Sequence, residues 1–171
     1  MTLTELNSSP DDELMRVLLE CCDVPAWARA VAAGRPYPGV DALLAVADDA
    51  ARRLAPADVD RALAAHPRIG ERPQGRGTGA DWSRREQAGV DPDERTRAEL
   101  LEGNRAYEDR FGRVFLICAS GLSGEQILAA LRERLGNDPA TEDAVVADEL
   151  RKIALLRLRR VVDESPAAAR A

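Results

Sequence analysis

His66 is the only histidine among the 171 residues of the chain. The ordinary pKa of imidazole, about 6.5, makes histidine the side chain best suited to proton transfer near neutral pH. Because a residue before proline avoids helical geometry, Pro67 predicts that the preceding helix ends at His66. The dipole of that helix would favour a protonated imidazole, which a general acid requires. A structural or surface histidine is the alternative, and the count excludes a metal site built on several histidines.

A second group of polar side chains follows at helical spacing. If the segment from Asp81 is a helix, Ser83, Glu86 and Gln87 lie at positions i, i+3 and i+4 and share one face. A hydroxyl, a carboxylate and an amide on one face could orient a small polar ligand. The alternative is an ordinary solvated side of a helix.

Arg157 interrupts an apolar stripe on the last predicted helix. The stripe consists of Val146, Leu150, Ile153 and Val161. A guanidinium at that position needs an anionic partner or carbonyl groups, because an unpaired buried charge is very costly. The partner is either a carboxylate of the core or a carboxylate of a ligand, which the planar arginine fork binds well. Arg134, on the preceding predicted helix, is a weaker candidate for the same role.

The segment between residues 67 and 80 is rich in glycine and is predicted to be a loop. A phosphate-binding loop is disfavoured there, because a dinucleotide-binding fingerprint must follow a strand and a Walker loop ends in Gly-Lys-Ser/Thr. We interpret the segment as a mobile flap beside a site.

The composition predicts a packed globular domain, with 45% hydrophobic and 32% charged residues. The net charge of -6 disfavours nucleic acid and anionic membranes as partners. The chain shows no secretory leader, no apolar stretch of the roughly 20 residues that span a bilayer, and no CxxC pair among its three cysteines. We therefore expect a cytoplasmic protein.

Helical signals dominate the chain and predict an all-α fold of about seven to eight helices. We expect one domain over residues 1–171, with its core at about 9–162 and a frayed tail at 163–171. Ser9 is the predicted cap of the first helix, Gly112 ends a helix from about residue 92, and Ser123 with Gln126 forms a capping box. The other predicted helices cover 27–31, 40–54, 56–66 and about 141–162. The apolar segment 114–119 is either a strand or a buried helical segment.

Several ordered motifs together resemble the OHCU decarboxylase family, whose members act on 2-oxo-4-hydroxy-4-carboxy-5-ureidoimidazoline (OHCU). They are His66-Pro67-Arg68-Ile69-Gly70-Glu71, Ser83 with Glu86-Gln87-Ala88-Gly89, Asn104-Arg105-Ala106-Tyr107 with Arg110-Phe111-Gly112, Phe115-Leu116-Ile117-Cys118-Ala119, and Lys152-Ile153 with Leu156-Arg157-Leu158. The resemblance extends from about residue 9 to residue 162.

The resemblance implies an all-helical homodimer that decarboxylates this ureidoimidazoline to (S)-allantoin in urate breakdown, without a cofactor. It implies that His66 is the proton donor, Glu86 the essential carboxylate and Arg157 the substrate-binding guanidinium. It adds Pro67, Ser83 and Gln87 to the substrate site, together with backbone groups of Phe115, Leu116, Ile117, Cys118 and Ala119. Two alternatives are a non-catalytic helical interaction domain that docks a partner through the His66 loop, and a hydrolase of cyclic ureides in which Glu86 and His66 activate water.

Overall fold

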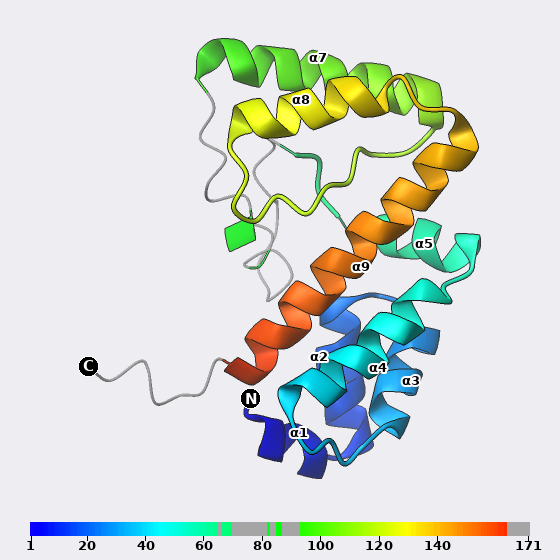
Figure 1. Ribbon diagram of the computed structural model, residues 1–171, viewed down its shortest axis with the longest axis vertical. Helices are drawn as coiled ribbons and strands as arrows, with labels where there is room; N and C mark the ends of the chain where they lie inside the picture. Colours follow the sequence, from blue (N-terminus) through cyan, green and yellow to red (C-terminus); the bar gives the residue numbers. More distant parts are fainter. Residues whose placement is uncertain (65, 70–81, 83–84, 87–92, 164–171) are drawn as a thin grey trace. The chain divides into compact units, whose positions relative to one another are not determined.

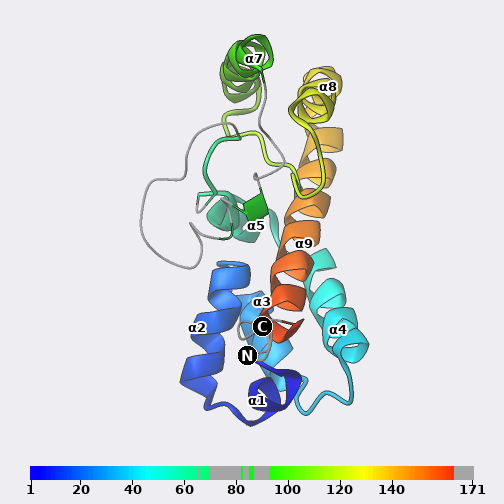
Figure 2. The ribbon, with the colours of Figure 1, turned by 90° about the vertical axis from the view of Figure 1, so that its left-hand side faces the viewer.

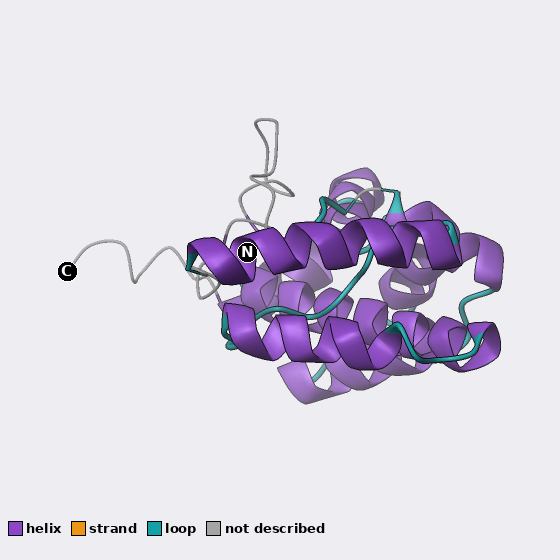
Figure 3. Ribbon diagram, turned by 90° about the horizontal axis from the view of Figure 1, so that it is seen from above, coloured by secondary structure: helices purple, strands orange, loops and turns teal. Residues whose placement is uncertain are grey.

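The computed structural model describes residues 1–64, 66–69, 82, 85–86 and 93–163. These residues are helical or irregular and contain no strand, as the predicted all-α fold requires (Figures 1 and 3). The helices with assigned bounds are α1 (Leu3–Ser8), α2 (Asp11–Cys21), α3 (Pro25–Ala33), α4 (Val40–Arg52), α5 (Pro56–Leu63), α7 (Glu94–Phe111), α8 (Gly124–Arg134) and α9 (Pro139–Asp163). In this part of the chain, no helix is both long enough and apolar enough to cross a membrane.

The chain divides into two compact units, each of which is described by itself. One unit contains residues 1–62 and the chain from Arg151 onward, and the other contains residues 63–150. The predicted boundaries of one domain over residues 1–171 stay a prediction.

In the first unit, α3 lies between α2 and α4 (Figure 2). Trp27 is 1% exposed, and its indole nitrogen donates a hydrogen bond of 3.0 Å to the carbonyl of Ala47 on α4. Burial of the large ring provides apolar contact, while the hydrogen bond satisfies its one polar group. The tryptophan therefore joins α3 to α4 within this unit.

The beginning of the chain differs from the prediction. Residues 3–8 form α1, which was not predicted, and Thr2 and Glu5 form its capping box. The hydroxyl of Ser9 donates to the carbonyl of Glu5 at 2.7 Å, so this serine closes α1. Helix α2 begins after Pro10 without a side-chain cap, and the predicted capping role of Ser9 is therefore wrong.

In the second unit, α7 and α8 lie side by side, and the segment between them runs back to the start of α8 (Figure 1). Gly112 ends α7 in the left-handed conformation, at φ 69°, and Ser123 and Gln126 form the predicted capping box. The core of this unit consists of Ile69, Leu100, Tyr107, Phe115, Ile117, Ala119, Ile127, Leu128 and Leu131. The core thus includes residues from the two segments, 66–69 and 115–119, that the sequence predicts to be functional.

Candidate functional site

His66 lies just beyond the end of α5. The helix ends at Leu63, three residues earlier than predicted, and the amide of His66 donates to the carbonyl of Leu63 at 2.9 Å. This bond spans three residues instead of four, so the backbone tightens into a turn before Pro67. His66 is half-buried and its Nε2 atom is buried. Pro67 is also half-buried.

Two contacts with α7 hold the segment that follows His66. The side-chain amide of Asn104, which is 3% exposed, donates to the carbonyl of Ile69 at 2.9 Å. One turn farther along α7, Glu108 accepts two hydrogen bonds from Arg68, at 2.5 and 2.8 Å. The Arg68 guanidinium lowers the pKa of Glu108, against a smaller opposing effect of burial. These contacts fix residues 68 and 69 on α7.

Glu86 belongs to the same unit as His66 and is buried, with 8% of its surface exposed. The backbone of residues 82, 85 and 86 is helical; Trp82 is buried and Arg85 is exposed. Glu86 therefore lies on the buried face, one turn after Trp82, and the alternative of a solvated helix side is wrong for this carboxylate. Ser83, Gln87 and the glycine-rich residues 70–80 lie outside the described residues.

The segment from Phe115 to Ala119 is neither a strand nor a helix. The side chains of Phe115, Ile117 and Ala119 belong to the hydrophobic cluster named above, whereas Leu116 is buried outside that cluster and Cys118 is half-buried. The intervening backbone is bound by two charged side chains: Arg134 donates to the carbonyl of Leu116 at 2.7 Å, and the amide of Cys118 donates to Glu149 at 2.7 Å. Long-range side-chain contacts thus satisfy backbone groups that a ladder or a helix would otherwise satisfy.

Arg134 and Glu142 form a buried ion pair, with 7% and 0% of their surfaces exposed. Arg134 donates to one carboxylate oxygen of Glu142 through Nε at 2.9 Å and through Nη2 at 2.6 Å. The Tyr107 hydroxyl donates to the same oxygen, and Asn137 donates to the other oxygen at 2.8 Å. The guanidinium also lies over the Phe115 ring, 4.6 Å from its centroid. We call Tyr107, Arg134 and Glu142 the buried cluster.

The pKa values within the buried cluster follow from these contacts. Burial, reinforced by the hydrogen bond to Glu142, raises the pKa of Tyr107 to about 12. Burial also raises the pKa of Glu142, but the hydrogen bonds from Arg134, Tyr107 and Asn137 outweigh it, and the net shift is downward. Arg134 therefore has its anionic partner inside the protein, and its role as a binder of a ligand carboxylate is not supported.

Arg157 belongs to the other unit and is 5% exposed, as its place in the apolar stripe predicts. Its charge acts on Cys22, a residue of the same unit with 1% of its surface exposed. Burial raises the pKa of the Cys22 thiol to about 12, and the Arg157 charge opposes that rise. The two alternatives for Arg157, a core carboxylate or a ligand carboxylate, both stay open.

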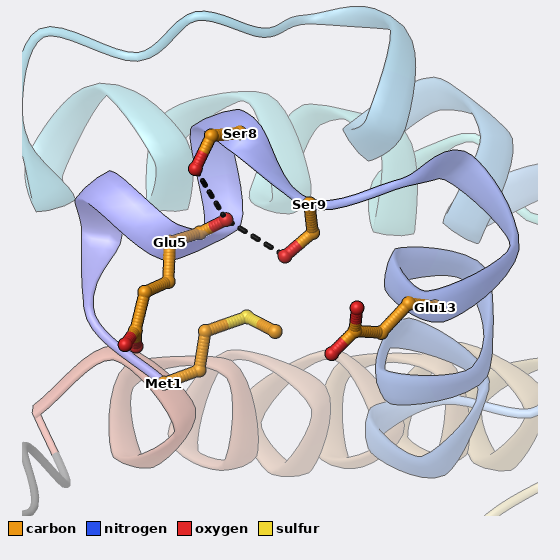
Figure 4. Close-up of a pocket in the computed structure, with 5 residues that line it drawn as sticks. All are labelled: Met1, Glu5, Ser8, Ser9 and Glu13. Carbon is orange, nitrogen blue, oxygen red and sulfur yellow. Dashed lines mark hydrogen bonds between the residues drawn. The ribbon is translucent and has the colours of Figure 1, made fainter.

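An open hollow in the first unit is lined by Met1, Glu5, Ser8, Ser9 and Glu13 (Figure 4). The hydroxyls of Ser8 and Ser9 both donate to the carbonyl of Glu5. None of the predicted site residues lines this hollow, and its two carboxylates would repel an anionic ligand. In the described part of the chain, no three His, Cys, Asp or Glu side chains gather in a group that could hold a metal ion.

Glu142 and Glu149 were not among the residues predicted from the sequence. Both occupy α9 in the part that belongs to the second unit, where the sequence shows an ordinary acidic helix. A signal for Glu142 was the neighbouring Arg134, a cation that ends an otherwise apolar helical stripe and needs a counter-ion. No local signal marks Glu149, because its partner is a backbone amide 31 residues away.

Comparison with known proteins places this arrangement in context. The family model described as OHCU decarboxylase matches residues 7–159. A protein of Amia calva named 2-oxo-4-hydroxy-4-carboxy-5-ureidoimidazoline decarboxylase is 34% identical over 170 residues, which is 95% of each chain. An Arabidopsis thaliana protein named uric acid degradation bifunctional protein TTL is 32% identical over 149 residues, which cover 84% of this chain and 46% of that protein.

A solved structure is similar as well. A crystal structure of OHCU decarboxylase, in the presence of (S)-allantoin, matches with a TM-score of 0.75 and 28% sequence identity. The match covers 91% of this chain and 100% of that chain.

Proposed function

The chain belongs to the OHCU decarboxylase family, and on that premise we propose that it converts OHCU into (S)-allantoin in urate breakdown. It is a decarboxylase, a member of the carboxy-lyases. The observation that carries the proposal is the family match over residues 7–159, which include every residue assigned a role below.

The chemistry defines what the protein must supply. The bond between the ring carbon and the carboxylate breaks, and carbon dioxide leaves without the bonding electron pair. That pair passes into the adjacent C=N bond of the ring and leaves an enol at the hydroxyl-bearing carbon. The enol hydroxyl loses its proton as the ring carbonyl forms, and a proton is added to the neighbouring carbon, which bears the ureido group. The protein must stabilise the anionic transition state and deliver the proton to one face only, because (S)-allantoin is a single enantiomer.

His66 is the proposed proton donor. Its imidazole is half-buried with Nε2 inside the protein. The segment that carries it is restricted by the fixed φ of Pro67 and by the hydrogen bonds of Ile69 and Arg68 to Asn104 and Glu108 of α7. A donor held in one orientation can protonate the carbanion-like intermediate from one side.

Glu86 is the proposed partner that orients the substrate. Its carboxylate is buried, and hydrogen bonds from neutral donors to an ionised acceptor are strong in such surroundings. The hydroxyl and ureido groups of OHCU are donors of this kind. Ser83 and Gln87, which the family resemblance implies, would add a hydroxyl and an amide.

Arg157 is the proposed anchor of the substrate's anionic group. The planar guanidinium can bind a carboxylate through two parallel hydrogen bonds. Backbone amides of residues 115–119 would bind the developing oxyanion, with the exception of Cys118, whose amide already donates to Glu149.

The decisive experiment supplies fresh OHCU, made in place by uricase and hydroxyisourate hydrolase, and follows circular dichroism of the allantoin formed. We expect optically active allantoin to form faster than the spontaneous decay of OHCU, which gives the racemate. His66→Asn should abolish turnover without loss of helicity. Arg159→Gln is the matched control, because Arg159 has a half-exposed side chain and lies 3.8 Å from Asp41 on the surface. Racemic allantoin at the uncatalysed rate would refute the proposed function.

We also propose that the protein is a cytoplasmic homodimer. The family resemblance supports the dimer, and three free cysteines, two of them buried, suit a compartment that keeps thiols reduced. Light scattering coupled to size-exclusion chromatography would give the mass of the assembly in solution, and a monomer at micromolar concentration would contradict this proposal.

A further inference from the structure

Arg134 and Glu149 bind the two ends of one short piece of backbone. Arg134 reaches the carbonyl of Leu116 from α8, and Glu149 receives the amide of Cys118 from α9, both at 2.7 Å. From these contacts we propose that Arg134 and Glu149 are positioning residues, which hold residues 115–119 in register for catalysis. The proposal rests on the proposed function.

The shape of this segment follows from where its side chains lie. The side chains of Phe115, Ile117 and Ala119 enter one hydrophobic cluster, whereas the buried Leu116 and the half-buried Cys118 lie outside it. Such alternation with a period of two is typical of an extended chain. In an extended chain, the backbone groups of residues 116 and 118 point to one side, and those of 115, 117 and 119 point to the other.

One side of this backbone is occupied by charged side chains of the protein. The carbonyl of Leu116 and the amide of Cys118 are the groups that Arg134 and Glu149 bind, so the side facing α8 and α9 is taken by the protein itself. The amides of Ile117 and Ala119 belong to the opposite side. That edge is the one that can donate hydrogen bonds to the substrate, and the two charged residues determine where it lies.

The Arg134 side chain is held rigidly by its own contacts. Arg134 is held by Glu142 through two hydrogen bonds, lies over the ring of Phe115, and has 7% of its surface exposed. Glu142, in turn, accepts hydrogen bonds from Tyr107 on α7 and from Asn137. A donor fixed in this way cannot follow the segment if it moves, and it therefore restrains the Leu116 carbonyl to one place.

Turnover depends steeply on the position of the groups that bind the substrate. Displacement of a substrate-binding group by about 1 Å lowers turnover on the order of a hundredfold. Arg134 and Glu149 touch backbone and not substrate, so their effect should fall on turnover and on stereochemistry more than on affinity.

The most informative variants are at Glu149, which is only half-buried and is less needed for folding than Arg134. Glu149→Ala removes the acceptor of the Cys118 amide, whereas Glu149→Gln keeps an oxygen that can accept it. We expect Glu149→Ala to lower kcat at least tenfold, which is roughly the effect of one hydrogen bond to a charged group. KM should change less than threefold, and the enantiomeric excess of the allantoin should fall. Glu149→Gln should restore most of kcat. Asp143→Ala, which removes an exposed carboxylate of the same helix, is the control.

A spectroscopic signal gives a second readout that does not depend on turnover. The amide proton of Cys118 should resonate downfield because it donates to a carboxylate, and it should move upfield in Glu149→Ala. Arg134→Lys, compared with Arg132→Lys on the exposed side of α8, should reproduce the loss of kcat with unchanged helicity. If Arg134→Lys fails to fold, the Glu149 variants decide the question alone.

The outcomes separate the two proposals. Absence of optically active product from the wild-type protein would refute the proposed function itself. Wild-type activity together with unchanged kcat and enantiomeric excess in Glu149→Ala would overturn the positioning role. Equal losses in Glu149→Ala and Glu149→Gln would also overturn it, because they would show a need for the negative charge and not for the hydrogen bond.

Discussion

The buried cluster of Tyr107, Arg134 and Glu142 allows a stability prediction to be worked out in detail. Glu142→Leu removes the carboxylate that accepts the bonds of 2.9 and 2.6 Å from Arg134 and the bond of 2.8 Å from Asn137. It leaves a guanidinium with 7% exposure and no carboxylate partner. Breaking a buried ion pair in this way costs about 3–5 kcal/mol, so we expect the free energy of unfolding to fall by about 4 kcal/mol.

A double-mutant cycle completes the test by removing the Arg134 cation as well. In Arg134→Met combined with Glu142→Leu, no charge is left in the buried cluster, and the residual loss comes from the unpaired carbonyl of Leu116 and the unpaired hydroxyl of Tyr107. Each of these costs about 1–2 kcal/mol, so the double variant should lie only about 2–4 kcal/mol below the wild type. Arg134→Met alone leaves a buried carboxylate without its cation and should also cost about 4 kcal/mol. The two single losses then sum to about 8 kcal/mol, which corresponds to a coupling of about 4–6 kcal/mol.

Urea unfolding followed by far-ultraviolet circular dichroism measures the free energy of unfolding of the wild type, the two single variants and the double variant. With a slope of about 2 kcal/mol/M, Glu142→Leu should lower the urea midpoint by about 2 M. Arg132→Met with Glu99→Leu is the control, because that pair lies on the surface of the same unit and should change stability by less than about 1 kcal/mol. Additive losses in the buried pair would refute the reasoning.

Acid provides a further check on the same group. Since the folded protein lowers the pKa of Glu142, the carboxylate contributes stability that is present above its ordinary pKa of 4.5 and is lost as the pH falls through the lowered value. The wild type should therefore lose stability in acid more steeply than Glu142→Leu. Parallel curves for the two proteins would contradict this assignment.

Three further predictions concern other groups. Asn104→Leu removes the donor to the Ile69 carbonyl and should lower kcat about tenfold in steady-state assays of OHCU turnover. An unchanged kcat would exclude a role for this hydrogen bond in holding His66. In the folded protein, iodoacetamide should label the half-exposed Cys118 well before Cys22, and (S)-allantoin should slow that labelling, as mass spectrometry of the alkylated peptides would reveal. Because burial raises the pKa of Cys22 from 9.0 to about 12, the folded protein should lose roughly 3–4 kcal/mol of stability between those pH values, and Cys22→Ala should lose correspondingly less.

Local features of the fold could be predicted because their causes lie within a few residues. Gly112 was assigned as a helix end because glycine alone adopts the left-handed conformation without strain, and the structure has it at φ 69°. Ser123 and Gln126 cap α8 because a serine followed three residues later by a glutamine is the pattern of a capping box. The helix over residues 3–8 was not predicted, although Thr2 and Glu5 show the same capping pattern, because a helix of 6 residues is too short to show an apolar periodicity.

The features that could not be predicted depend on long-range contacts. Nothing near Leu116 indicates that its carbonyl binds a guanidinium 18 residues later, and so the segment 114–119 could be expected only as a strand or a helix. Arg134 was ranked as a weaker binder of a ligand anion than Arg157, and its ion pair with Glu142 explains that order. The roles of His66, Glu86 and Arg157 stay predictions that the experiments above would test.

The half-buried imidazole of His66 has a practical consequence for spectroscopy. With no other histidine in the chain, its ring nitrogens give the only histidine signals in a nitrogen-15 spectrum, and they need no assignment. Those chemical shifts distinguish the two neutral tautomers from the cation, and hence report whether the buried Nε2 carries the proton. The protonation state of the proposed donor can thus be followed during a titration with (S)-allantoin, in the unmodified protein.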